Sequence, residues 1–147
     1  MSRRALARRG GAVQGGELAA HVARSEPWAW AAESKNKWGP KGWRWLHLVA
    51  IRYPLAPTRA DAMVAFIRLW NFLTNLPCSE CREHAIVYFS RHPPDLSNGE
   101  AFQTWAWRFH NSVNSRLRKP LVSHEAYVES FARDIRMASS ERRGVPS

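Results

Sequence analysis

The chain has 147 residues, enough for one domain with a moderate core, and its two cysteines exclude a disulfide-stabilised scaffold. Its apolar stretches are too short to cross a bilayer and its N-terminus lacks the apolar segment of a secretory signal, so we expect a protein of the cytosol, the nucleus or a related compartment. The net charge of +10 is spread over both tails and the centre, which argues against one concentrated recognition surface for nucleic acid.

The N-terminal 36 residues are rich in Ala, Arg and Gly and show little helical periodicity. We expect them to form a basic, partly disordered extension. Its arginines either attract nucleic acid or anionic surfaces without sequence preference, or are simply solvated.

The first two predicted helices flank a Tyr-Pro step. In WGPKGWRWLHLVAIRYP, Trp43, His47 and Ala50 follow helical spacing, and Pro54 ends the segment. Thr58 is a plausible N-cap for the next helix, with Asp61 three residues later. The expected inward face of that second helix consists of Met63, Phe66, Ile67, Trp70 and Leu73.

Two or three further helices follow Pro77, which we expect to stop the second one. The third is expected from about Cys78 to Ser90, with Cys81, Ala85 and either Tyr88 or Phe89 facing inward. HPPDLSNG is a loop, and Ser97 with Glu100 resembles a capping box for the fourth helix, which ends near Lys119 and Pro120. Ser123 is expected to cap a last amphipathic piece that runs to about Arg136.

No segment shows the two-residue alternation of a strand between hairpin turns. Four or five helices with short connections predict an all-α fold, an antiparallel four-helix bundle with a short fifth helix. The lack of strands also disfavours a thioredoxin-like fold, in which a C-x-x-C pair follows a strand and opens a helix.

Both cysteines lie in LPCSECREH, two residues apart, where a helix is expected to begin. Unpaired N–H groups and the positive end of the helix dipole would favour a thiolate at Cys78, and Cys81 is close enough to form a disulfide with it. Two alternatives are unreactive buried thiols and a zinc site that adds His84 and another histidine. A zinc site would need a compact loop where we expect a helix, which disfavours it.

A second constellation lies on the fourth helix, where His110 and Asn114 share one face and Asn111 is adjacent. Polar side chains on an aromatic helix need partners, which are either one another, water, or a ligand with several donors and acceptors. His47 on an apolar face has the same two interpretations. Eight tryptophans in a chain of this length suggest either heavy core packing or a platform for a flat ligand.

Taken together in order, WGPKGWRWLH, Tyr-Pro, LPCSECREH and WAWRFHNSVNSRLRKP resemble the FAD-linked sulfhydryl oxidase family of the ALR/Erv type, from about Trp38 to Phe131. The resemblance implies FAD at the mouth of the bundle and a thiol oxidase that forms disulfide bonds in substrate proteins and reduces O₂ to H₂O₂. It implies Cys78 as the substrate-facing catalytic sulfur and Cys81 as the flavin-proximal one, while His84 either tunes Cys81 or is merely exposed. The positions that the resemblance matches to cofactor contacts are Gly39, Trp43, His47, Tyr53, His110, Asn111, Asn114, Leu117, Lys119 and Phe131.

The chain also departs from the family pattern. It has no second, shuttle cysteine pair, so either protein thiols reach Cys78 directly or an external dithiol protein acts as relay. Ser90 and Ala101 stand where relatives commonly have a structural disulfide, and the homodimer that the resemblance implies must rest on packing alone. Such a minimal form resembles viral members, which implies the host cytoplasm or the virion as its location.

We therefore expect residues 1–36 to be an extension, 37–137 to be the FAD-binding oxidase domain, and 138–147 to be a tail. We expect neither a metal ion nor a specific nucleic acid as a partner. The alternative function is a basic helical nucleic-acid-binding or scaffold domain in which the C-x-x-C pair is not catalytic.

Overall fold

The computed structural model describes residues 35–144, and side chains from residue 37 onward. The expected extension 1–36 therefore lies almost wholly outside the described residues. The described part contains six helices and no strand, which confirms the all-α prediction. They are α2 (Lys35–Arg52), α3 (Arg59–Thr74), α4 (Ser79–Arg91), α5 (Gly99–Arg116), α6 (His124–Ser130) and α7 (Ala132–Arg142).

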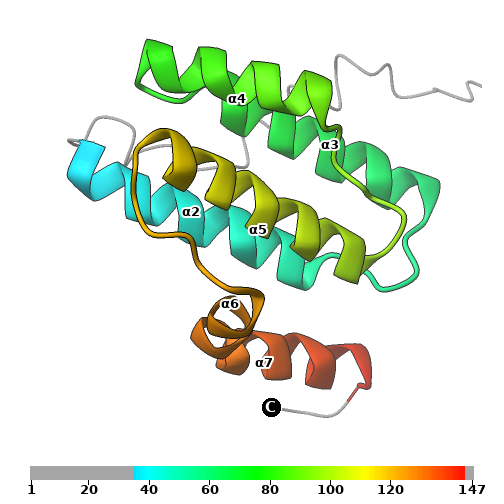
Figure 1. Cartoon of the computed structure of the whole chain (residues 1–147). Coiled ribbons are helices and arrows are strands. Elements are labelled where there is room, and N and C mark those ends of the chain that lie inside the picture. Colours follow the sequence, from blue (N-terminus) through cyan, green and yellow to red (C-terminus); the bar gives the residue numbers. More distant parts are fainter. Residues whose placement is uncertain (1–34, 145–147) are drawn as a thin grey trace, which may run out of the picture.

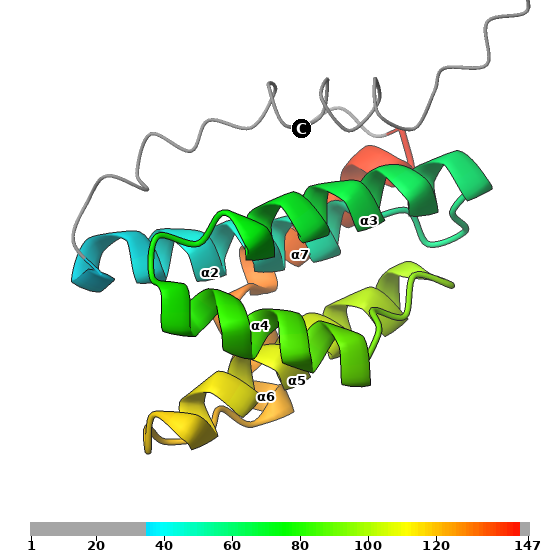
Figure 2. The ribbon, with the colours of Figure 1, turned by 90° about the horizontal axis from the view of Figure 1, so that it is seen from above.

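The helices form three tiers in Figure 1: α3 and α4 above, α2 and α5 in the middle, and α6 and α7 below. Figure 2, seen from above, shows α4 crossing over α5 and α3 lying along α2. A single core joins the first four helices, with Leu46, Leu73 and Phe102 fully buried at its centre. The short α6 is seen nearly end-on in Figure 1 and therefore lies across the bundle.

Two of the predicted helix starts are confirmed by their hydrogen bonds. The side chain of Thr58 accepts the N–H of Asp61, whose carboxylate accepts the N–H of Thr58 in return, which is a complete capping box. Ser123 caps α6 by accepting the N–H of Ala126.

The predicted cap of α5 is wrong by one residue. Asn98, not Ser97, accepts the N–H of Ala101 at 2.9 Å. Ser97 is held by Asp95 instead, because its N–H and hydroxyl both donate to the Asp95 carboxylate. This local turn fixes Ser97 before the helix begins and leaves the next residue as the cap.

The predicted inward face of α3 is also wrong in most of its members. The buried residues are Ala65, Leu69, Phe72 and Leu73. Met63, Phe66 and Trp70 are 49%, 45% and 39% exposed, and the rings of Phe66 and Trp70 contact Phe89 of α4 only at the edge of the core. Because α3 is apolar on more than one side, its sequence is compatible with two alternative inward faces. The face that packs on the bundle contains the small Ala65, which permits a closer approach.

The last predicted helix is divided into α6 and α7 at Phe131, whose φ of −109° and ψ of 13° interrupt the helix. α7 then continues to Arg142, past the expected helix end near Arg136 and past the expected domain boundary at 137. Ala138 is buried, so the first residues of the expected tail pack against the domain.

Candidate functional site

A cavity of about 610 Å³ opens between α2, α5 and α6, with Cys81 of α4 at one side. This volume lies within the range of roughly 300–1,000 Å³ that is typical of small-molecule and cofactor sites. Nine of its lining residues carry aromatic or imidazole rings, and Arg44, Arg116 and Lys119 are also among the lining residues.

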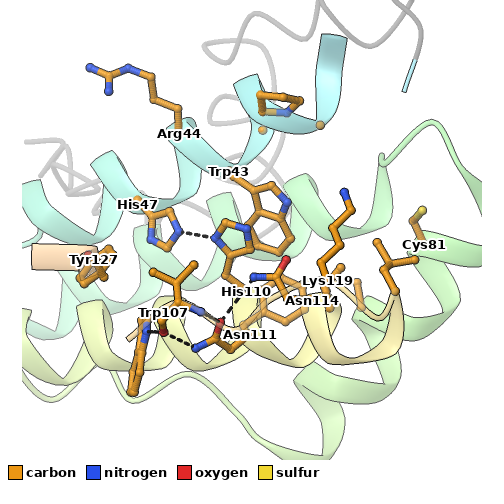
Figure 3. Close-up of a pocket in the computed structure, with 18 of the residues that line it drawn as sticks. Trp43, Arg44, His47, Cys81, Trp107, His110, Asn111, Asn114, Lys119 and Tyr127 are labelled. Atoms are coloured by element: carbon orange, nitrogen blue, oxygen red, sulfur yellow. Dashed lines mark hydrogen bonds between the residues drawn. The ribbon is translucent and has the colours of Figure 1, made fainter. Parts of the chain in front are cut away.

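A cluster of three rings from α2 and α5 forms the centre of one wall. The indole of Trp43 stacks on the imidazole of His110 with ring centroids 3.9 Å apart and an interplanar angle of 8°. Nε2 of His47 lies 2.9 Å from Nδ1 of His110, which is a hydrogen bond between the two imidazoles, drawn as a dashed line in Figure 3. Trp43 and His110 therefore lie parallel, whereas the ring of His47 is tilted by 33° to that of His110.

Both imidazoles in this cluster are neutral at pH 7. Burial, followed by the nearby His110, lowers the pKa of His47 to about 3. Burial, followed by the charge of Lys119, lowers the pKa of His110 to about 4. Each neutral ring has one donor and one acceptor nitrogen, and the shared hydrogen bond uses one nitrogen of each.

Two buried polar atoms beside the cavity have no hydrogen-bond partner: Nδ1 of His47 and the hydroxyl of Tyr127. Their side chains are 2% and 4% exposed, and their rings contact each other with centroids 5.0 Å apart. Burial also raises the pKa of Tyr127 to about 12, so its hydroxyl keeps its proton. Unpaired buried polar atoms are costly and are typical of a binding site whose ligand completes the hydrogen bonding.

Asn111 fixes the loop that leads into α6. Its side-chain N–H donates to the carbonyl of Val122 at 2.8 Å, and its side-chain oxygen accepts the N–H of Val122 at 2.9 Å. The indole N–H of Trp107 donates to the same carbonyl at 2.8 Å. Asn114 donates weakly to the Asn111 oxygen at 3.4 Å. The amide of Asn111 thus positions the wall that α6 contributes.

The two cysteines have different surroundings. Cys78 is the N-cap of α4, and its Sγ accepts the N–H of Cys81 at 3.3 Å, an interaction that stabilises negative charge on sulfur. Cys81 lines the cavity, and Cys78 is not among the lining residues. In Figure 3, Cys81 lies at one end of the row of labelled side chains and Tyr127 at the other.

Glu80, between the cysteines, links α4 to α5. Its carboxylate lies 3.2 Å from Nη1 of Arg116 and 3.8 Å from Nε2 of His84. His84 is half exposed and does not line the cavity. The structure therefore gives His84 a place on the surface beside Glu80.

Most of the predicted site residues come together at this cavity. The lining includes Gly39, Trp43, His47, Cys81, His110, Asn111, Asn114, Leu117, Lys119 and Phe131. Tyr53 is the cofactor position that the structure does not bring there. It lies six residues beyond His47, about 9 Å along the helix axis, where its hydroxyl donates to the carbonyl of Leu96 and its ring meets the edge of Phe102.

Sequence reasoning missed several lining residues, among them Arg44, Trp107, Arg116 and Tyr127. Tyr127 had a signal in the sequence, because it lies four residues before Phe131 and therefore on the same side of a helix. Trp107 and Arg116 belong to the same motif-bearing helix as His110, but only the packing of α6 against α5 shows which side of that helix is covered.

Within residues 35–144, no three His, Cys, Asp or Glu side chains gather as metal ligands would. None of the helices there is long and apolar enough to span a membrane.

Comparison with known proteins gives consistent matches. A model of the Erv1/Alr family matches residues 40–133. An FAD-linked sulfhydryl oxidase of African swine fever virus (isolate Warthog/Namibia/Wart80/1980) is 43% identical over 98 residues, which cover 67% of this chain and 82% of the relative. The crystal structure of the yeast Erv1 core aligns with a TM-score of 0.63 at 28% identity, over 66% of this chain and 82% of that one.

Proposed function

The chain belongs to the Erv1/Alr family, and from this premise we propose that it is an FAD-dependent thiol oxidase that forms disulfide bonds through its C-x-x-C pair. The observation that carries the proposal is the position of Cys81 in the wall of the same cavity that Trp43 and His110 line. A dithiol beside a cofactor-sized aromatic pocket can pass electrons to a redox cofactor bound in that pocket.

The residues at the cavity fit FAD. The unpaired Nδ1 of His47 and hydroxyl of Tyr127 offer hydrogen bonds to a ligand with several polar atoms. The stacked Trp43 and His110 present a flat surface to an aromatic ring system. Lys119 supplies positive charge for a pyrophosphate, whereas Arg44 and Arg116 line the cavity in ion pairs with Asp134 and Glu80. We propose that these residues hold the cofactor, together with Gly39, Asn114, Leu117 and Phe131.

The cysteine pair handles the thiol chemistry. A substrate thiolate attacks Sγ of Cys78 in the Cys78–Cys81 disulfide, which forms a mixed disulfide and releases Cys81 as a thiolate. A second substrate thiolate then attacks the substrate sulfur of the mixed disulfide, which gives oxidised substrate and leaves both cysteines reduced. The backbone N–H of Cys81 stabilises the sulfur of Cys78 as it departs. When bound, FAD supplies the two-electron acceptor that returns the pair to a disulfide and passes the electrons to O₂ as H₂O₂.

The partners follow from the cysteine count. Because the chain has only these two cysteines, we propose that a thiol-containing protein or an external dithiol relay protein delivers electrons directly to Cys78. The exposed Met63, Phe66 and Trp70 on α3 support a homodimer that packs without disulfides. The similarity to viral oxidases supports a place in the host cytoplasm or the virion.

Purified protein tests the proposal through its colour and its oxygen consumption. We expect flavin absorbance near ~450 nm and O₂ uptake with dithiothreitol. Cys81→Ser should retain FAD but lose uptake, whereas Ser79→Ala, between the cysteines, should keep both. A colourless protein, or equal turnover by wild type and Cys81→Ser, would refute the proposal.

A further inference from the structure

We propose that α7 is a noncovalent strap that holds the α6 wall of the cofactor pocket in place, and that Arg142 is the positioning residue that fastens it. This inference rests on the proposed function in so far as the pocket holds FAD. Arg142 lies nine residues beyond the part of the chain that the family model matches.

The α6 wall of the pocket is not stable by itself. α6 has seven residues and α7 has eleven, and isolated helices of this length are marginal in water. Yet α6 and the residue after it bring Tyr127, Ser130 and Phe131 to the cavity. The rings of Tyr127 and Phe131 contact the ring of His47 on α2, with centroids 5.0 and 5.1 Å apart, and the chain on either side of these contacts is held by further anchors.

The upstream anchor is the pair of hydrogen bonds between Asn111 and Val122. The downstream anchor must lie in α7, which packs against α2. Ala138 is the one buried residue among the eleven of α7, all of which the structure describes. Because α7 buries so little apolar surface, its attachment depends on polar contacts.

Arg142 makes the strongest of these contacts. Its Nη2 donates to the carbonyl of Ile51 at 2.5 Å and to the carbonyl of Tyr53 at 2.7 Å. Both carbonyls lie where α2 ends, a place where carbonyls lack partners within the helix and where the helix dipole favours a cation. A second link, between Arg44 of α2 and Asp134 of α7 at 3.5 Å, is more exposed and weaker.

The strap therefore connects the two sides of the pocket. α2 carries Trp43 and His47, the rings of Tyr127 and Phe131 pack against His47, and α7 continues directly from this α6 wall, as the lower tier of Figure 1 shows. Cys78 caps α4, in the upper tier, and Cys81 lies in the first turn of that helix. If α7 detaches from α2, FAD should dissociate faster, and the rate of thiol exchange at the cysteines should be unchanged.

The test compares Arg142→Ala with Arg143→Ala, which removes the same charge one position later. In the FAD-loaded protein we expect Arg142→Ala to release FAD about three- to ten-fold faster, which is less than the usual effect of a hydrogen bond to a charged group because the side chain is partly exposed. Release is followed by the rise in free-flavin fluorescence after dilution. Arg142→Lys should recover part of the retention, because a single nitrogen makes both bonds. At saturating FAD, kcat with dithiothreitol should match that of the wild type.

Amide hydrogen exchange separates the strap from a general loss of stability. In Arg142→Ala, exchange should accelerate at the N–H groups of Tyr127, Phe131 and Ile135 but not in α3 or α4. Wild-type FAD release and wild-type exchange in α6 would overturn the strap. Exchange is also read in protein without FAD, so a chain that fails to bind FAD refutes the proposed function and still reports on the strap.

Discussion

The buried His47–His110 pair makes the stability of the domain sensitive to acid. In the folded protein the pKa of His47 is about 3 and that of His110 about 4, whereas an unfolded histidine titrates near 6.5. Because the unfolded chain binds more protons than the folded chain in this range, the free energy of unfolding must decrease as the pH falls below about 6.5. The decrease continues until the folded pKa values are reached.

The size of the effect follows from the shifts. One pKa unit corresponds to about 1.36 kcal/mol, so the fall of His110 from 6.5 to about 4 corresponds to about 3 kcal/mol and that of His47 to about 5 kcal/mol. These are upper bounds, because His110 keeps some contact with solvent. Protonating either ring also disturbs their one shared hydrogen bond, so we expect about 3–5 kcal/mol for the pair rather than the sum.

Urea unfolding of the cofactor-free protein at pH 7, 6, 5 and 4.5 measures this decrease. The double variant His47→Gln, His110→Gln should be less stable at pH 7 but should show a much flatter dependence on pH. His84→Gln, which changes a surface histidine, should follow the wild type. If the double variant loses as much free energy of unfolding between pH 7 and 4.5 as the wild type does, the buried pair is not the cause.

Three further predictions concern single contacts. Asn98→Ala should lower the free energy of unfolding, measured in urea, by about 1 kcal/mol, whereas Ser97→Ala should lower it clearly less. The opposite order would show that Ser97 is the N-cap of α5. Gly99→Ala should destabilise the domain by about 1–3 kcal/mol, because a Cβ there would lie 3.0 Å from the carbonyl oxygen of Tyr53. Thermal unfolding measures this loss, with Gly39→Ala as the control because nothing lies within 4 Å of a Cβ at that position. Phe131→Leu removes an aromatic ring that lines the cavity, and an aromatic pair contributes about 0.5–1.5 kcal/mol. FAD should therefore bind about two- to ten-fold more weakly in a fluorescence titration, and unchanged affinity would contradict a role for Phe131 at the cofactor.

The sequence predicted what depends on local chemistry. The Thr58–Asp61 box was predictable because both partners lie within one helical turn. The inequality of the cysteines was likewise predictable from the helix start at Cys78. The number of bundle helices followed from the prolines and the apolar spacing.

The rest depends on contacts between distant segments. On α3, helical periodicity could not choose between two apolar stripes, and the choice depends on how closely α3 approaches the bundle through Ala65. Tyr53 matched a family motif, but its hydroxyl is held by the carbonyl of Leu96, 43 residues away. Arg142 gave no signal at all, because its acceptors are backbone carbonyls, which every residue has.

The loop between α4 and α5 shows how this chain does without a structural disulfide. Ser90 and Ala101 stand where the family resemblance places one, and closing a loop of that size would contribute about 3 kcal/mol. In its place, Trp105 donates its indole N–H to the carbonyl of His92 at 2.7 Å, and Tyr53 donates its hydroxyl to the carbonyl of Leu96 at 2.8 Å. Two such bonds contribute about 1–3 kcal/mol together, a comparable amount. Because Cys78 and Cys81 are the two cysteines of the sequence, no structural disulfide competes with this pair for exchange with a substrate thiol.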